Sequence, residues 1–180
     1  MAIDHLQQVI RMLDLRPMAH ASPEAWSRHE AAIGGVELPA DYKEFVDACG
    51  PCQVNGKVHI GHPATARWNL TEKVIGVREA FRRYDWADLP TAVLDGPGSL
   101  TPLASSDEGH QIFLWQSPPD APGPAIVVHV GDGECVVHPM GFSEWMHRFL
   151  LGEHMLGEDS AYDYTAGLGT EDPFIEPLPL

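Results

Sequence analysis

The amino-terminal half of the chain places apolar residues at the three-to-four-residue spacing of α-helices. This spacing predicts a first helix over about residues 3–15, which ends before Pro17. Ser22-Pro23 is typical of a helix start, so a second helix is expected to run to Ile33 and to stop at the glycines that follow. A further amphipathic stretch predicts a helix over residues 70–83.

The clearest helix signal lies at residues 38–50. Its apolar positions fall on one stripe, Pro39 stands in the first turn, and Gly50 is typical of the residue that ends a helix in the left-handed conformation. Asn55-Gly56 then predicts a tight hairpin, and residues 58–60 form the returning strand. This segment therefore predicts a helix followed directly by a hairpin.

The second half places its apolar residues in short runs that are typical of strands. The runs cover residues 100–104, 112–115, 125–130 and 134–138. Pro102 cannot donate a ladder hydrogen bond, so its strand is expected to be bulged or at an edge there, whereas the run ending at Trp115 is apolar on both faces and predicts a central strand. A last helix is expected from Ser143 to Gly152.

The connection between the last two strands predicts a register. A two-residue turn at Asp132-Gly133 would place Val130 opposite Cys135. The same register would bring His129 and His138 together on one face, either as a pair able to share a ligand or as two half-exposed histidines.

Charge divides the chain into two unequal parts. The 180 residues carry 26 acidic and 11 basic side chains, for a net charge of −15. Acids and bases balance over residues 1–84, whereas Arg148 is the one base after that point. An acidic chain is a poor ligand for nucleic acid or for an anionic membrane, because both need a basic face. The excess of acidic side chains could serve to bind a basic partner, or it could serve solubility alone.

Length and composition indicate one globular domain with an acidic tail over residues 153–180. No apolar run has the length of a membrane span, and the first residues lack the features of a signal peptide. Three cysteines, an odd number, then suggest reduced thiols in the cytoplasm.

Cysteine and histidine offer two chemical hypotheses in one segment. Cys49-Gly50-Pro51-Cys52 has the spacing of a redox pair, but Cys49 falls at the end of a predicted helix, where the dipole disfavours a thiolate, so packing and helix termination are the favoured interpretation. With His59 and His62 the same cysteines supply four ligand types that zinc accepts, and the hairpin would allow His59 to lie opposite Cys52. The zinc spacing matches no established finger or knuckle, and the position of Cys49 disfavours redox chemistry, so no catalytic residue, metal ligand or cofactor is assigned.

Three segments resemble the SUKH superfamily, named for the bacterial Syd protein, a herpesviral family and the yeast Smi/Knr regulators of cell-wall synthesis. The first runs from Leu38-Pro39 through Tyr42 and Phe45 to Gly50. The second is the strand and turn over residues 103–109, and the third is the closing helix that begins at Gly141-Phe142. The resemblance covers residues 24–152 and leaves the tail outside, and the segment after Gly50 departs from the usual glycine-rich hairpin.

The resemblance implies an α+β fold, a single domain over residues 1–152 in which helices pack around a mixed, mostly antiparallel curved sheet. It also implies a non-enzymatic role, since many bacterial members look like immunity proteins that bind polymorphic toxins, and others look like intracellular adaptors. The motif residues themselves, among them Leu38 and Tyr42, are expected to build the fold.

We therefore expect a cytoplasmic protein-binding domain that neutralises a basic, nuclease-like toxin. A regulatory adaptor of the same family is the alternative, and a Cys/His zinc or redox protein is a third. Nuclease toxins need basic clefts for phosphate, and acidic loops can occupy such a cleft. The acids expected to bind lie in the predicted loops and turns of the second half: Asp85, Asp88, Asp107, Glu108, Asp132 and Glu134.

Overall fold

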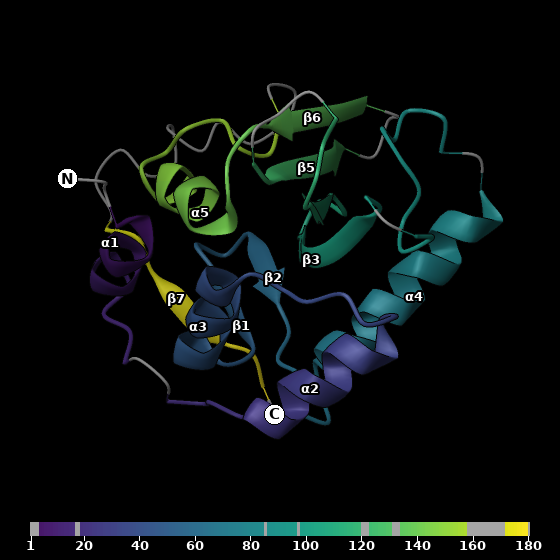
Figure 1. The fold of residues 1–180 in the computed structure, drawn as a ribbon. Coiled ribbons are helices and arrows are strands. Elements are labelled where there is room, and N and C mark those ends of the chain that lie inside the picture. Colours follow the sequence, from purple (N-terminus) through teal and green to yellow (C-terminus); the bar gives the residue numbers. More distant parts are fainter. Residues whose placement is uncertain are drawn as a thin grey trace.

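The computed structural model describes residues 4–16, 19–84, 86–96, 98–119, 123–130, 134–157 and 172–179. Five helices lie in these ranges: α1 (His5–Met12), α2 (Pro23–Ala32), α3 (Ala40–Cys49), α4 (Leu70–Arg83) and α5 (Phe142–Leu150). Seven strands accompany them: β1 (Cys52–Val54), β2 (Val58–Ile60), β3 (Leu100–Ser106), β4 (Gln111–Trp115), β5 (Ala125–Val130), β6 (Glu134–His138) and β7 (Ile175–Pro177). The fold is α+β, as the sequence predicted (Figure 1).

The strands form one curved sheet in the order β6-β5-β4-β3-β2-β1-β7, and the described strand pairs are all antiparallel. The register shifts between Pro102 and Ala104 in β3, which confirms the irregularity predicted there. β4 lies between β3 and β5, as predicted for a strand that is apolar on both faces.

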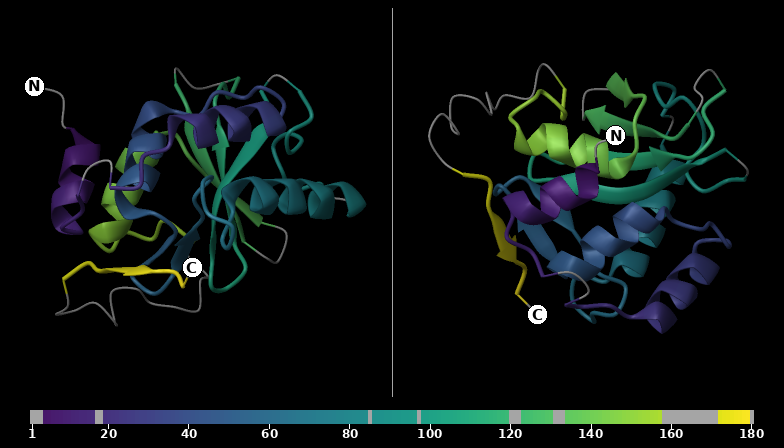
Figure 2. Two further views of the ribbon diagram at one scale, coloured as in Figure 1. Left: turned by 90° about the horizontal axis from the view of Figure 1, so that it is seen from below. Right: turned by 60° about the vertical axis from the view of Figure 1, so that its left-hand side comes forward.

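The helices lie on both sides of the sheet (Figure 2, left). α1, α3 and α5 pack against one another on one side, and α4 crosses the other side against β3. α2 lies beside α3 and α4. Its Trp26 packs edge-on against Tyr42 of α3, and its His29 forms a hydrogen bond with Thr71 of α4. The sheet is therefore the middle layer, and its two faces meet different surroundings.

The face toward α1, α3 and α5 holds the larger part of the core. Strand alternation points Val58, Ile60, Ile112 and Val128 to this side, and all four are fully buried. Tyr42 on α3 is also fully buried, and its hydroxyl donates to the Leu103 carbonyl over 2.8 Å. The stripe predicted for residues 38–50 thus faces the core.

The described end of the chain adds an edge strand to the sheet. β7 pairs with β1, and the junction is fixed at Asn55, whose amide donates to the Phe174 carbonyl over 2.9 Å. The Asn55 side-chain oxygen accepts from the Phe174 amide over 2.8 Å. The residues predicted as a tail therefore contribute one of the seven strands.

The β5–β6 register differs from the predicted one by a single residue. Val130 lies opposite Glu134 and His129 opposite Cys135, so a three-residue connection replaces the expected Asp132-Gly133 turn. A shift of one residue moves every side chain of a strand to the other face. His129 and His138 therefore point to opposite faces of the sheet, and the prediction that they share one face is wrong.

Candidate functional site

The topology brings the predicted acidic residues to one end of the sheet. β3 ends, β4 begins, β5 ends and β6 begins there, since Ser105 pairs with Gln111 and Val130 pairs with Glu134. We call this region the acidic end and define it by four of the predicted residues: Asp88, Asp107, Glu108 and Glu134. The other two, Asp85 and Asp132, lie outside the described residues.

The β3–β4 turn holds Asp107 and Glu108 in a fixed geometry. The Ser106 hydroxyl accepts from the Glu108 and His110 amides over 3.2 and 3.1 Å, which closes the turn. Lys57, from the β1–β2 turn, reaches Asp107 Oδ2 at 2.8 Å and Glu108 Oε1 at 4.0 Å. One ammonium group therefore faces two carboxylates, and the turn keeps a net negative charge.

His110 connects this turn with β5. Its Nε2 lies 3.6 Å from Glu108 Oε2, while burial, opposed by the charges of Glu108 and Asp107, lowers its pKa. The charge of His129 on β5 lowers it further, which places the two rings in one electrostatic neighbourhood. A neutral His110 adds no positive charge to that of Lys57, so the turn keeps its net negative charge.

Asp88 occupies the β5–β6 side of the acidic end. Its Oδ2 lies 2.9 Å from His129 Nε2 and 3.7 Å from Cys135 Sγ, and the two side chains it contacts are cross-strand partners. Burial first, and the Asp88 carboxylate second, raise the pKa of Cys135 to about 12. The thiol is therefore held in its protonated form and is a poor nucleophile.

A row of polar side chains crosses the α4 face of the sheet, with one residue from each strand. Directly paired residues share a face, and the pairings link the row without a gap. From β7 to β6 the row consists of Glu176, Gln53, His59, Ser105, Gln111, His129 and Cys135. The opposite face is apolar at most of the neighbouring positions, with Ser106 and Glu134 as polar exceptions at the acidic end.

Lys73 of α4 reaches down to the middle of this polar row. Its Nζ donates to Ser105 Oγ over 2.8 Å and to the His59 carbonyl over 3.2 Å. Burial lowers its pKa to about 8. With Lys57 it is one of two described lysines beside the acidic end, which therefore holds more carboxylates than ammonium groups.

No local sequence pattern predicts this polar row. Its members are scattered over seven strands, and strand pairing alone makes them neighbours. Turn length predicts how the two strands of a hairpin pair. β7 and β1, and likewise β2 and β3, are far apart in sequence, so no turn predicts their pairing.

The cysteines predicted as a redox or zinc candidate lie at the end of α3. The Cys49 and Cys52 sulfurs are 3.1 Å apart and both thiols are free. Burial, followed by the contact with Cys52, raises the pKa of Cys49 well above its ordinary value. This environment opposes the thiolate that a redox nucleophile or zinc ligand requires.

The hairpin does not bring His59 opposite Cys52. Cys52 pairs with Ile60 and Gln53 pairs with His59, so the two side chains point to opposite faces, and that prediction is wrong. His62 instead lies 3.3 Å from Asp47 Oδ1, which also accepts from Trp26 Nε1 over 2.8 Å. Within the described ranges, no three Asp, Glu, His or Cys side chains are grouped as metal ligands.

No protein-family model, curated protein or solved structure matches this chain. Its resemblance to the SUKH superfamily therefore rests on the sequence motifs. In the described part of the chain, no helix combines the length and apolar composition needed to cross a membrane.

Proposed function

We propose that this chain is a non-enzymatic protein-binding domain of the immunity type, which acts in the cytoplasm and neutralises a basic, nuclease-like toxin domain. The observation that supports the proposal most directly is the convergence of Asp88, Asp107, Glu108 and Glu134 on one end of the sheet. These residues come from three separate parts of the sequence, and a different topology would have scattered them.

The acidic end has the charge that suits a nuclease cleft. Such a cleft is lined with lysine and arginine because it binds phosphates, and a set of fixed carboxylates can take the place of those phosphates. Oppositely charged surfaces also speed association, most strongly at low salt. Lys57 and Ser106 hold the β3–β4 turn in place, so little conformational entropy is lost when a partner docks there.

The test combines co-expression with a salt series. Nuclease-type toxin domains are expressed in bacteria with and without the chain, and rescue of growth identifies a partner. The association rate and the affinity of the purified pair are then measured from about 50 to 500 mM salt, and we expect both to fall as salt rises. An affinity that does not weaken with salt contradicts the electrostatic part of the proposal.

A matched pair of double variants locates the surface. Asp107→Asn with Glu108→Gln removes two charges from the acidic end, whereas Glu37→Gln with Glu44→Gln removes two exposed charges elsewhere. We expect the first pair to slow association at low salt severalfold and the second to leave it nearly unchanged. Equal effects would show that net charge, and not this surface, governs binding. Capture of several housekeeping proteins in place of one toxin would favour the regulatory adaptor.

A further inference from the structure

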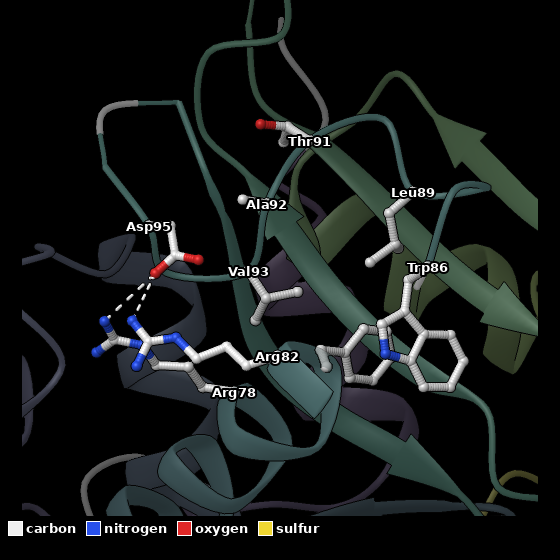
Figure 3. A pocket seen from close by; sticks show the side chains of 9 residues that line it. Arg78, Arg82, Trp86, Leu89, Thr91, Ala92, Val93 and Asp95 are labelled. Atoms are coloured by element: carbon white, nitrogen blue, oxygen red, sulfur yellow. Dashed lines mark hydrogen bonds and ion pairs between the residues drawn. The ribbon is translucent and has the colours of Figure 1, made fainter. Parts of the chain in front are cut away.

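A cleft opens between the carboxyl-terminal half of α4 and the loop that leads from α4 to β3 (Figure 3). Arg78, Phe81 and Arg82 line it from the helix, and Trp86, Val93 and Asp95 line it from the loop. We call it the arginine–tryptophan cleft. Its volume of about 330 Å³ lies within the range of clefts that bind small molecules.

One end of this cleft is cationic. Arg78 and Arg82 are four residues apart on α4, and both point to the same oxygen of Asp95: Arg78 Nη2 lies 3.4 Å and Arg82 Nη2 2.7 Å from Oδ1. Two guanidinium groups therefore share one carboxylate and keep a net positive charge. This is notable in a chain whose net charge is −15.

The arginines also retain unused hydrogen-bonding capacity. Each guanidinium carries five N–H donors in a planar fork that matches carboxylate and phosphate oxygens. Arg78 Nε is buried and finds no hydrogen-bond partner among the described residues. A buried donor without a partner is costly, so the Arg78 side chain gains if it turns to meet a ligand oxygen in the cleft.

The other end of the cleft is apolar and is lined by flat aromatic rings. Phe81 and Trp86 stack with ring centroids 4.2 Å apart and planes 22° apart, and the buried Val93 contributes to the wall between this end and the arginines (Figure 3). Trp86 Nε1 is likewise buried without a partner in the described part of the chain. The stacked rings suit a flat apolar group.

We propose that the arginine–tryptophan cleft binds a small organic anion whose carboxylate or phosphate group pairs with Arg78 and Arg82 and whose planar body lies against Trp86. The Asp95 carboxylate pairs with both guanidinium groups and competes with the ligand for them. The site is separate from the acidic end in charge and in partner, so it adds a small-molecule function to the proposed protein-binding role.

The direct test follows the indole N–H of Trp86 by NMR in the full ¹⁵N-labelled chain. Trp86→Phe identifies this resonance, because it removes the N–H and keeps a ring in place. Benzoate and phenyl phosphate are added in separate titrations, with benzyl alcohol as the neutral analogue. We expect saturable shifts with at least one anion and none with the alcohol, and the tighter anion decides between a carboxylate and a phosphate ligand. Equal shifts with benzyl alcohol, or no shift with either anion at about 10 mM, overturn the proposal.

Two variants and a control separate a binding site from a structural clamp. Arg78→Gln should weaken anion binding about tenfold or more, and Asp95→Asn should tighten it because the competing carboxylate is gone. Arg83→Gln removes an exposed charge from the same helix outside the cleft and should change binding little. Amide spectra verify the fold of each variant. If folded Asp95→Asn binds the anion more weakly, or Arg83→Gln matches Arg78→Gln, the proposal is wrong.

Discussion

Lys73 Nζ donates to Ser105 Oγ over 2.8 Å and so joins α4 to the polar row of the sheet. The same ammonium group donates to the His59 carbonyl on the adjacent strand. Burial makes the charged form costly and lowers its pKa from 10.5 to about 8. Lys73 therefore holds the helix over the sheet, and its ammonium group loses its proton more readily in the folded protein than in the unfolded chain.

Lys73 should make the protein more stable as pH rises through the alkaline range. Between about pH 8 and 10.5 the unfolded chain binds more protons at this site than the folded one, so the free energy of unfolding increases with pH. The contribution is roughly 2 kcal/mol between about pH 7 and pH 10. Urea unfolding of the wild type and of Lys73→Met, measured at both pH values, isolates it.

The variant supplies the control, because every other titrating group is common to both proteins. We expect the difference in unfolding free energy between wild type and Lys73→Met to move in favour of the wild type as pH rises. A difference that stays constant over this range would mean that Lys73 titrates near its ordinary pKa in the folded protein.

His29 should make the free energy of unfolding depend on pH in the acidic range. It is buried, its Nδ1 lies 2.9 Å from Thr71 Oγ1, and its Nε2 has no hydrogen-bond partner among the described residues. Burial lowers its pKa from 6.5 to about 4, against a smaller opposing effect of Glu30. The unfolded chain therefore binds the proton more readily, and this contribution to stability is present above about pH 6.5 and is lost as pH falls toward 4.

Replacing His29 should flatten that acid dependence. The wild type is expected to lose about 2 kcal/mol more unfolding free energy than His29→Gln when pH falls from about 7 to about 5. Urea unfolding at the two pH values gives the comparison, and His154→Gln at an exposed histidine is the matched control. Parallel losses in wild type and His29→Gln would contradict the prediction.

The helices and the first hairpin were predictable because their signals are local. Ser22-Pro23, Pro39 and Gly50 mark helix ends in the sequence, and α3 and α4 begin and end within two residues of the predicted positions. Asn55-Gly56 needs two positive φ angles, and the structure has 50° and 64° there. Each of these features depends on residues that are close in sequence.

The β5–β6 register was not predictable in the same way. Ile126, Val127 and Val128 are all fully buried, so β5 is apolar on both faces and its pattern fits two registers equally well. The connection length decides between them, and one extra residue there moved Cys135 beside His129 and Asp88. The acidic residues of the candidate site could be proposed from charge, but the polar row beside them depends on pairings between distant strands.

Tyr42 should contribute to stability through its hydroxyl group. The side chain is fully buried, and its hydroxyl donates a 2.8 Å hydrogen bond to the Leu103 carbonyl at the irregular part of β3. Tyr42→Phe leaves that carbonyl without its donor and should lower the unfolding free energy by about 1–2 kcal/mol. Tyr84→Phe, at a residue that is 67% exposed, is the control and should stay within about 0.5 kcal/mol of wild type. Equal losses of unfolding free energy in the two variants would mean that the hydrogen bond of the Tyr42 hydroxyl does not stabilise the fold.

Asp88 should control the reactivity of Cys135. Burial is the larger cause of the raised thiol pKa, and the Asp88 carboxylate, 3.7 Å from the sulfur, is the next. Asp88→Asn removes the negative charge, so the thiol pKa should fall and the thiolate fraction should rise at any pH below it. Alkylation by iodoacetamide at about pH 9, followed at the Cys135 peptide by mass spectrometry, should be faster by about tenfold for each unit by which the pKa falls. Asp107→Asn removes an acid of the same end that does not contact Cys135, and it should leave the rate unchanged. If Asp88→Asn also leaves it unchanged, burial alone protects the thiol, and Asp88 serves the acidic end through His129 only.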